Sequence, residues 1–154
     1  MPNTYTQLYI HAVFVVKGRS NLISPKFKEE LYKYICGIAT GKNQKIYAIN
    51  GMPDHLHIIL SMRPEISLSD HMRDIKANSS KWINERKFVR GKFQWQEGFG
   101  GFSVSKRDLD RVISYIKNQE THHAKKSFRT EYLELLEEYD IPYDEKYLFE
   151  FIEY

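Results

Sequence analysis

Residues 51–62, with the sequence GMPDHLHIILSM, carry the pattern that decides the fold. The first four residues, 51–54, are rich in turn formers. The next eight, His55–Met62, form a short apolar run that predicts a strand. The segment before the turn, Gln44–Asn50, also predicts a strand. We therefore expect an antiparallel hairpin here.

Strand and helix signals alternate on both sides of this hairpin. Further strands are expected at Tyr5–Lys17 and at Phe93–Val104, the second interrupted by the glycine-rich residues 98–101. Helices are expected from Ser24-Pro25 to about Thr40, from Ser67 to beyond Trp82, from Ser105 through Gln119, and from Thr130 to Tyr139. The order is β-α-β-β-α-β followed by two helices. It predicts an α+β, ferredoxin-like split β-α-β sandwich, with an antiparallel sheet, helices on one face, a further C-terminal helix and an acidic helical tail.

The length and composition fit one soluble domain. With 154 residues and 42% hydrophobic content, we expect a single domain over residues 1–154. The longest uninterrupted apolar stretch, 12–16, is too short for a membrane span, and the first residues lack the features of a secretion signal. The single cysteine, Cys36, fits a reducing compartment. These features predict a cytoplasmic protein with no membrane partner.

Charge is distributed unevenly along the chain. Residues 131–154 hold nine acidic side chains and one basic one, whereas residues 1–130 have a net charge of +11. A basic body can bind a polyanion, and aromatic side chains can stack on unpaired bases. The same charges also suit an ordinary solvated surface. The densest basic region is a candidate for phosphate contacts and comprises Lys76, Lys81, Arg86, Lys87, Arg90 and Lys92.

His55 and His57 are separated by one residue in the third strand, so they share one face of the sheet. Leu56 and its alternating neighbours should pack against helices, which turns both imidazoles outward together. Two imidazoles at this spacing can provide half of a divalent metal site. The alternative is a pair of partly exposed histidines that are hydrogen-bonded to the backbone.

Tyr115 and Gln119 are four residues apart on the third predicted helix and lie along the same edge of its apolar stripe. A hydroxyl at that edge can reach a phosphate on the neighbouring sheet. The Gln119 carbonyl oxygen could join a metal site. His122 lies on the same edge and is a candidate base for the tyrosine. The alternative is an amphipathic helix with a tyrosine packed at its rim.

Both motifs together resemble the IS200/IS605-family transposases, single-tyrosine members of the HUH endonuclease superfamily. The resemblance rests on His55-Leu56-His57 and on Tyr115-Ile116-Lys117-Asn118-Gln119. It is supported by Met52-Pro53-Asp54 and by Trp95-Gln96-Glu97-Gly98-Phe99. It extends from about Tyr5 to His123. The acidic tail after Thr130 has no counterpart that we can assign.

The resemblance implies a residue-by-residue site. His55, His57 and Gln119 would bind Mg²⁺ or Mn²⁺, and Tyr115 on a catalytic helix would attack the DNA backbone to leave a 5′-phosphotyrosine. The partners implied are single-stranded DNA with hairpin ends and a second copy of the chain, with the tyrosine helix acting across a homodimer. The segment 98–101 would then be a hinge, although a β-bulge fits equally. No small-molecule substrate is implied, and a prokaryotic chain acting at the nucleoid is expected.

Three other functions fit parts of the pattern. A related HUH nuclease domesticated for processing repetitive palindromes would keep the same four residues. A rolling-circle replication initiator usually carries further motifs that are absent here. A catalytically silent module for binding single-stranded DNA would keep the fold without needing Tyr115. The intact His55, His57, Tyr115 and Gln119 argue against the silent module, and the DNA strand transferase is the leading hypothesis.

Overall fold

Four strands form one antiparallel sheet in the computed structural model, which describes residues 3–17 and 22–149. The strands are β1 (Tyr9–Val15), β2 (Lys45–Met52), β3 (His55–Ser61) and β4 (Gly100–Val104), in the spatial order β2-β3-β1-β4. Strands β2 and β3 form the predicted hairpin, with Met52 opposite His55. The sheet order and the β-α-β-β-α-β succession confirm the predicted ferredoxin-like fold.

Strand β1 is shorter than the sequence predicts. Its first residue, Tyr9, is opposite Ser61 at the end of β3 and opposite Val104 at the end of β4. Residues 3–8 therefore extend past both neighbouring strands, and Tyr5 is 92% exposed. The β-branched and aromatic composition of this segment favours a strand, but a strand also needs a partner to pair with.

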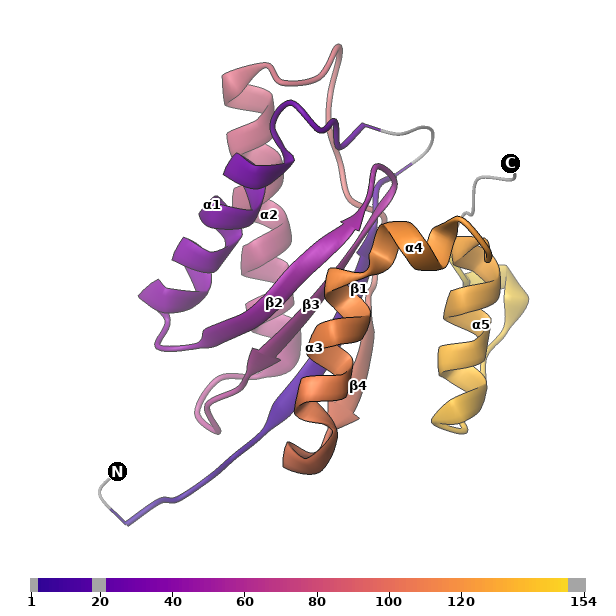
Figure 1. Cartoon of the computed structure of the whole chain (residues 1–154). Coiled ribbons are helices and arrows are strands. Elements are labelled where there is room, and N and C mark those ends of the chain that lie inside the picture. Colours follow the sequence, from indigo (N-terminus) through magenta and orange to yellow (C-terminus); the bar gives the residue numbers. More distant parts are fainter. Residues whose placement is uncertain (1–2, 18–21, 150–154) are drawn as a thin grey trace.

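Helices α1 (Lys28–Gly41) and α2 (Leu68–Arg86) cover one face of the sheet (Figure 1). The Ser67 side chain caps α2 by accepting a hydrogen bond from the Asp70 backbone, as the sequence predicts. Between these helices and the sheet lies the largest apolar core, which includes Phe14, Leu31, Ile35, Leu56, Ile58, Leu60, Met72 and Ile75. This face contains the apolar side chains expected to pack against helices.

Helices α3 (Leu109–Lys117) and α5 (Phe128–Glu138) cover the other face, and the short helix α4 (Gln119–His123) connects them through a turn (Figure 1). Helix α3 packs its apolar stripe on Tyr9, Ala48, Ile59 and Val104. Helix α5 packs Phe128, Tyr132 and Leu136 on Val13, Val15 and Phe102. This is the face that contains His55 and His57.

The third predicted helix is divided in two by the turn at Asn118. On strand β2, the Asn50 side-chain amide donates hydrogen bonds of 3.1 Å to the carbonyl oxygens of Ile116 and Lys117, at the end of α3. The carbonyl oxygens at a helix end lack partners within the helix, so this amide stabilises the end of α3. The expected single helix through Gln119 is therefore wrong, although its apolar stripe is correct.

The predicted strand Phe93–Val104 is also only partly formed, since β4 begins at Gly100. The earlier part of the predicted strand still pairs with the end of β1, because Trp95 forms an antiparallel bridge with Val16, but residues 97–99 interrupt the ladder before β4. Residues of this earlier part are also bonded to α2. Asn84 exchanges hydrogen bonds with the backbone of Phe93, and the Trp95 indole donates to the Ser79 hydroxyl at 3.0 Å. Lys76 donates to the carbonyl oxygens of Gln96 and Gly98.

The final helix begins two residues earlier than predicted, because the Ser127 side chain caps it by accepting from the Thr130 backbone. After α5 the described chain ends with a short 3-10 turn at Glu145–Tyr147. Two acidic residues of the predicted tail, Glu150 and Glu153, lie outside the described residues. Within the described residues, no helix has both the length and the apolar character needed to cross a membrane.

Candidate active site

His55 and His57 share the sheet face that α3 and α5 cover, and both imidazoles are fully buried. Their common face confirms the strand pattern. The expectation that they point outward to an open surface is wrong, because helices added after the β-α-β-β-α-β unit close over them. A buried imidazole needs partners for both ring nitrogens, and each of these histidines has them.

His57 is held from two sides. Its Nδ1 atom lies 2.8 Å from Nε2 of His11 on β1, and its Nε2 atom lies 2.9 Å from a carboxylate oxygen of Glu131 on α5. Burial and the neighbouring His57 lower the pKa of His11 to about 3. A neutral His11 can share its hydrogen bond with Nδ1 of His57 and fix the orientation of that ring. The second nitrogen of His57 then faces α5.

His55 is oriented in a similar way. Its Nδ1 atom lies 2.8 Å from the Asp54 carboxylate in the hairpin turn, and its ring stacks on Phe128 of α5 with centroids 3.8 Å apart. Its Nε2 atom lies 3.3 Å from the Gln119 carbonyl oxygen. Burial lowers the pKa of His55, although Asp54 acts in the opposite direction. Carboxylate support of one ring nitrogen is the usual arrangement behind a metal-binding histidine.

Gln119 is fully buried at the start of α4. Besides His55, its carbonyl oxygen lies 3.1 Å from Nε2 of His123, and its amide donates to Glu131 at 3.4 Å. The structure thus brings Gln119 to the imidazole pair as the sequence predicts. It does so through the turn at Asn118 rather than along a continuous helix edge.

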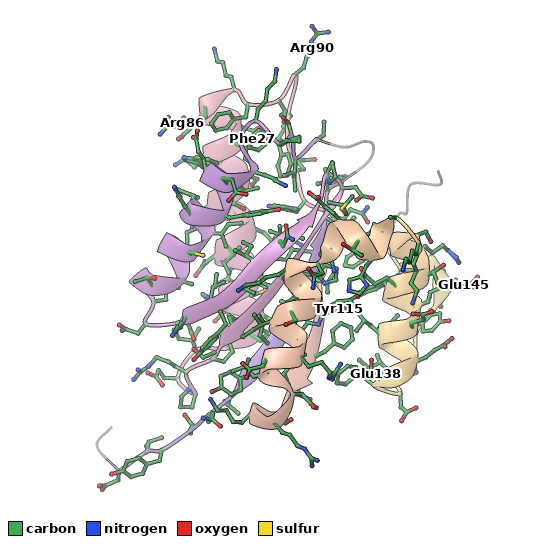
Figure 2. All side chains as sticks on the ribbon, viewed as in Figure 1. Phe27, Arg86, Arg90, Tyr115, Glu138 and Glu145 are labelled. Carbon is green, nitrogen blue, oxygen red and sulfur yellow. The ribbon has the colours of Figure 1, made fainter. Side chains whose placement is uncertain are left out.

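Tyr115 projects from α3 toward the same cluster, on the side that faces α5 (Figure 2). Its ring centroid lies 5.9 Å from that of His57 in the same chain, and its hydroxyl donates a hydrogen bond to Glu131. Burial raises the pKa of Tyr115 well above its ordinary value, and the Glu131 charge and hydrogen bond raise it further. The His122 ring is 4.6 Å from that of Tyr115. The hydroxyl itself is bonded to Glu131 and not to this candidate base.

Glu131 and His123 belong to the cluster but were not among the residues predicted from sequence. Burial would raise the pKa of Glu131, but the charge of His57 and hydrogen bonds from His123 and His57 hold it well below the usual range. Burial likewise lowers the pKa of His123, and Glu131 outweighs that and raises it. A signal for Glu131 was present, because this carboxylate lies one turn from Phe128 and Leu135 on an amphipathic helix. Starting the helix at Thr130 concealed that pattern.

The donor atoms fit a metal ion. His55, His57, His123 and Glu131 can each offer one ligand atom, and these four atoms all lie within 4.8 Å of one another. Two or three imidazoles with a carboxylate form a common donor set for divalent transition ions. The cluster could therefore hold a metal ion beside the Tyr115 hydroxyl.

A cleft of about 140 Å³ opens beside Tyr115 between α3 and α5. Arg111, His122 and Lys126 contribute to its lining, together with the acidic Glu134 and Glu138. The predicted basic region lies elsewhere, and its members Arg86 and Arg90 project away from Tyr115 (Figure 2). Lys76 of that region is engaged by backbone carbonyl groups. Whether the remaining residues contact phosphate stays a prediction.

Comparisons with known proteins identify the family of this chain. The family described as "Transposase IS200 like" matches residues 4–119, a range that includes Tyr115 and the His55/His57 pair. The ISDra2 transposase TnpA of Deinococcus radiodurans is 25% identical over 118 residues, covering 73% of this chain and 84% of the relative. The transposase for the insertion sequence element IS200 of Salmonella typhimurium is 27% identical over 114 residues, covering 71% and 74%.

Two solved structures share the fold. One is a putative transposase from Deinococcus radiodurans, with a TM-score of 0.62 and 21% identity, covering 76% of this chain and 94% of that one. The other is a REP-associated tyrosine transposase bound to a REP hairpin, with a TM-score of 0.60 and 18% identity, covering 79% and 72%. The family match covers most of the chain and stops before α5. The chain belongs to the IS200-like family of transposases.

Proposed function

We propose that this transposase cuts and rejoins single-stranded DNA through a covalent link between Tyr115 and a 5′-phosphate. The observation that carries the proposal is the position of the Tyr115 hydroxyl within its own chain. It is bonded to Glu131, and a carboxylate oxygen of Glu131 lies 2.9 Å from Nε2 of His57. A nucleophile beside a set of metal-binding donors suits phosphoryl transfer.

In the proposed step the Tyr115 oxygen attacks phosphorus, and the bond from phosphorus to the 3′-oxygen breaks. The tyrosine gives up its proton to water, and the departing oxygen takes up a proton from water to become a 3′-hydroxyl. The phosphotyrosine keeps the energy of the broken ester, so a second 3′-hydroxyl can displace the tyrosine and rejoin the strand. Because burial and Glu131 raise the pKa of Tyr115, we expect the hydroxyl to stay protonated until metal and DNA bind.

The proposed metal ligands from the sequence are His55, His57 and Gln119, and the proposed ion is Mg²⁺ or Mn²⁺. Two buried imidazole nitrogens and a carboxamide oxygen 3.3 Å from His55 support this set. A divalent ion held there would polarise the scissile phosphate and offset the negative charge that develops on it. His11 and Asp54 would orient the two imidazoles toward the ion.

We propose single-stranded DNA with hairpin ends as the substrate. The related REP-associated transposase was solved with a REP hairpin. In this chain the net charge of +11 on residues 1–130 suits a polyanion. We also propose that residues 1–154 act as one domain. The homodimer stays a prediction, since the proposed nucleophile and metal donors all come from a single chain.

The test is a covalent adduct. The full chain is incubated with Mn²⁺ or Mg²⁺ and labelled single-stranded DNA that carries the end hairpin of its element, and the products are separated in denaturant. We expect a protein–DNA adduct from the wild type and from the control Tyr147→Phe, whose side chain is exposed. Tyr115→Phe should yield no adduct. An equal yield from Tyr115→Phe would refute the nucleophile assignment.

The same assay separates the competing functions. A silent DNA-binding module would retain the hairpin but form no adduct under any metal condition. A domesticated nuclease would form the adduct on palindromes scattered through the genome and not on the ends of its own element. We favour the transposase, because the relatives matched over most of the chain are transposases of insertion sequences.

A further inference from the structure

Helix α5 brings a carboxylate into the centre of the site from outside the region that the family match covers. Glu131 is only 3% exposed. One of its oxygens lies 2.9 Å from Nε2 of His57, 3.3 Å from Nε2 of His123 and 3.8 Å from Nε2 of His55. The other oxygen accepts the Tyr115 hydroxyl. The matched range ends at residue 119, so Glu131 comes from the C-terminal segment that follows it.

The spacing of these donors is that of ligands around one ion. With ligand bonds of about 2.1 Å, neighbouring ligand atoms lie about 3.0 Å apart around an octahedral ion and about 3.4 Å apart around a tetrahedral one. The three distances from Glu131 to the imidazoles span this range. The Gln119 oxygen is 3.3 Å from His55 and 3.1 Å from His123. The ligand atoms of His55, His57, His123 and Glu131 all lie within 4.8 Å of one another, close enough to share one ion.

The buried charge of Glu131 also suits a divalent cation, although hydrogen bonds from Tyr115 and Gln119 already compensate part of it. A buried carboxylate is costly unless a positive charge or several hydrogen bonds compensate for it. The ion pairs that the structure shows for Glu131 within 4.0 Å are to imidazoles, which are themselves the favoured ligands of divalent metals. A divalent ion among these rings would balance the carboxylate directly.

Packing fixes Glu131 in this position. On either side of it along α5, Phe128 stacks on the His55 ring and Tyr132 packs on Phe102. Tyr132 lies so close to strand β4 that a Cβ atom on Gly100 would be 2.7 Å from its hydroxyl oxygen. Glycine at position 100 therefore leaves free the space that the Tyr132 side chain occupies. Helix α5 is built into the sheet face and presents Glu131 at a fixed point.

We propose that Glu131 is itself a ligand of the metal, together with the imidazoles of His55, His57 and His123, so that metal binding fastens α5 over the site. The role of the metal in catalysis rests on the proposed function, but metal binding by Glu131 does not. In the opposing interpretation of the same contacts, the Glu131 side chain is a plug that blocks the site. In that case its carboxylate occupies the position where the metal or the DNA phosphate binds, and it must move away before either can bind.

Metal affinity distinguishes the ligand from the plug. The metal-stripped full chain is titrated with Mn²⁺ by calorimetry, and its fold is checked by near-ultraviolet circular dichroism. We expect Glu131→Gln and Glu131→Ala to weaken Mn²⁺ binding by at least about tenfold, because even the groups that only orient metal ligands typically contribute about tenfold or more to affinity. The control is Glu134→Gln on the same helix, which removes an exposed ion pair to Lys126 and should leave the affinity unchanged. Equal or tighter binding by both Glu131 variants would overturn the proposal and favour the plug.

Hydrogen exchange provides a second readout that does not depend on DNA or activity. We expect Mn²⁺ to slow amide exchange across 128–138 in the wild type and in Glu134→Gln, and not in Glu131→Gln. Faster exchange in the wild type on adding Mn²⁺ would refute the proposal, because the metal would then displace α5. A chain that binds Mn²⁺ through Glu131 but forms no DNA adduct would refute the proposed function and leave this inference intact.

Discussion

Strand β3 sends Leu56, Ile58 and Leu60 to one face of the sheet, and His55 and His57 to the other. Both faces are buried by helices. The first is covered by α1 and α2 with apolar side chains, so its stability comes from area removed from water. The second is covered by α3 and α5, but its centre is a network of imidazoles, an amide, a hydroxyl and a carboxylate. One sheet thus has a face that stabilises the fold and a face whose polar groups must satisfy one another.

On the site face the chain buries polar groups for function at a cost in stability. Burying polar groups is unfavourable unless each finds a partner. On the site face the partners come from β1, β3, α3, α4 and α5, so segments far apart in sequence must meet with small tolerances. On the helix face many side chains of similar volume would serve. Substitutions should therefore mainly change stability on one face and mainly change metal and DNA chemistry on the other.

The largest loss of stability is expected for Phe14→Ala on the helix face. Phe14 is fully buried and packs edge-on against Trp95, with ring centroids 4.7 Å apart. Removing a buried phenyl ring should lower the free energy of unfolding by about 3–5 kcal/mol. Urea denaturation measures this change. Mn²⁺ affinity under folding conditions should stay at the wild-type value, and a parallel loss of affinity would mean that the two faces are not independent.

His57→Gln makes the reciprocal change on the site face. We expect Mn²⁺ affinity to fall by at least about a hundredfold, because the carboxamide replaces a central imidazole donor. The free energy of unfolding without metal should change much less than in Phe14→Ala, since glutamine can keep a hydrogen bond to Glu131. Calorimetric titration and urea denaturation of the same preparation test both halves. An unchanged affinity would remove His57 from the metal site.

The sequence predicted the scaffold better than the residues that surround the His55/His57 pair. The period-two pattern of β3, the turn at 51–54 and the Ser67 cap are local signals, and each predicted its element closely. His55, His57, Tyr115 and Gln119 could be proposed because two short motifs bring them onto known faces of a strand and a helix. The structure brings all four together.

The errors arise where distant contacts override local preference. Residues 3–8 have strand composition but extend past the ends of β3 and β4. Residues 97–99 interrupt the last predicted strand between Trp95, which still pairs with Val16, and the start of β4. Glu131 joins the site only because α5 folds back over β1 and β4. The sequence reveals a carboxylate beside the apolar residues of an amphipathic helix there, but not which face of the sheet that helix covers.

Asn50→Ala should have a smaller effect, and this effect should include both a loss of stability and a misalignment of Tyr115 and Gln119. It removes two hydrogen bonds to the end of α3, which should lower the free energy of unfolding by about 1–2 kcal/mol. Adduct formation should slow more than this loss of stability explains, because Tyr115 and Gln119 flank the released helix end. The matched control is Asn78→Ala, an exposed amide that bonds to a backbone carbonyl within α2. Equal effects of the two variants on adduct formation would contradict the alignment role.

The smallest expected effect concerns pH, and it contrasts an isolated buried imidazole with a partnered one. On the helix face His71 is fully buried, and neither ring nitrogen has a hydrogen-bond partner within residues 3–17 and 22–149. Burial lowers the pKa of His71, as does Lys42, while Asp74 opposes them. The unfolded chain then binds a proton at this residue more readily than the folded chain. Stability should therefore fall as pH drops below the ordinary value of 6.5.

His123 on the site face should respond in the opposite direction. Glu131 raises the pKa of His123 despite the burial of the ring, so its contribution to stability is complete at low pH and is lost as pH rises through the folded-state value. In the absence of metal, His71→Leu should flatten the loss of stability between pH 7 and pH 5, and His123→Leu should steepen it. Urea denaturation across this range measures both slopes. The same slope in both variants would mean that partners do not decide how these buried imidazoles titrate, and the contrast between the two faces would fail.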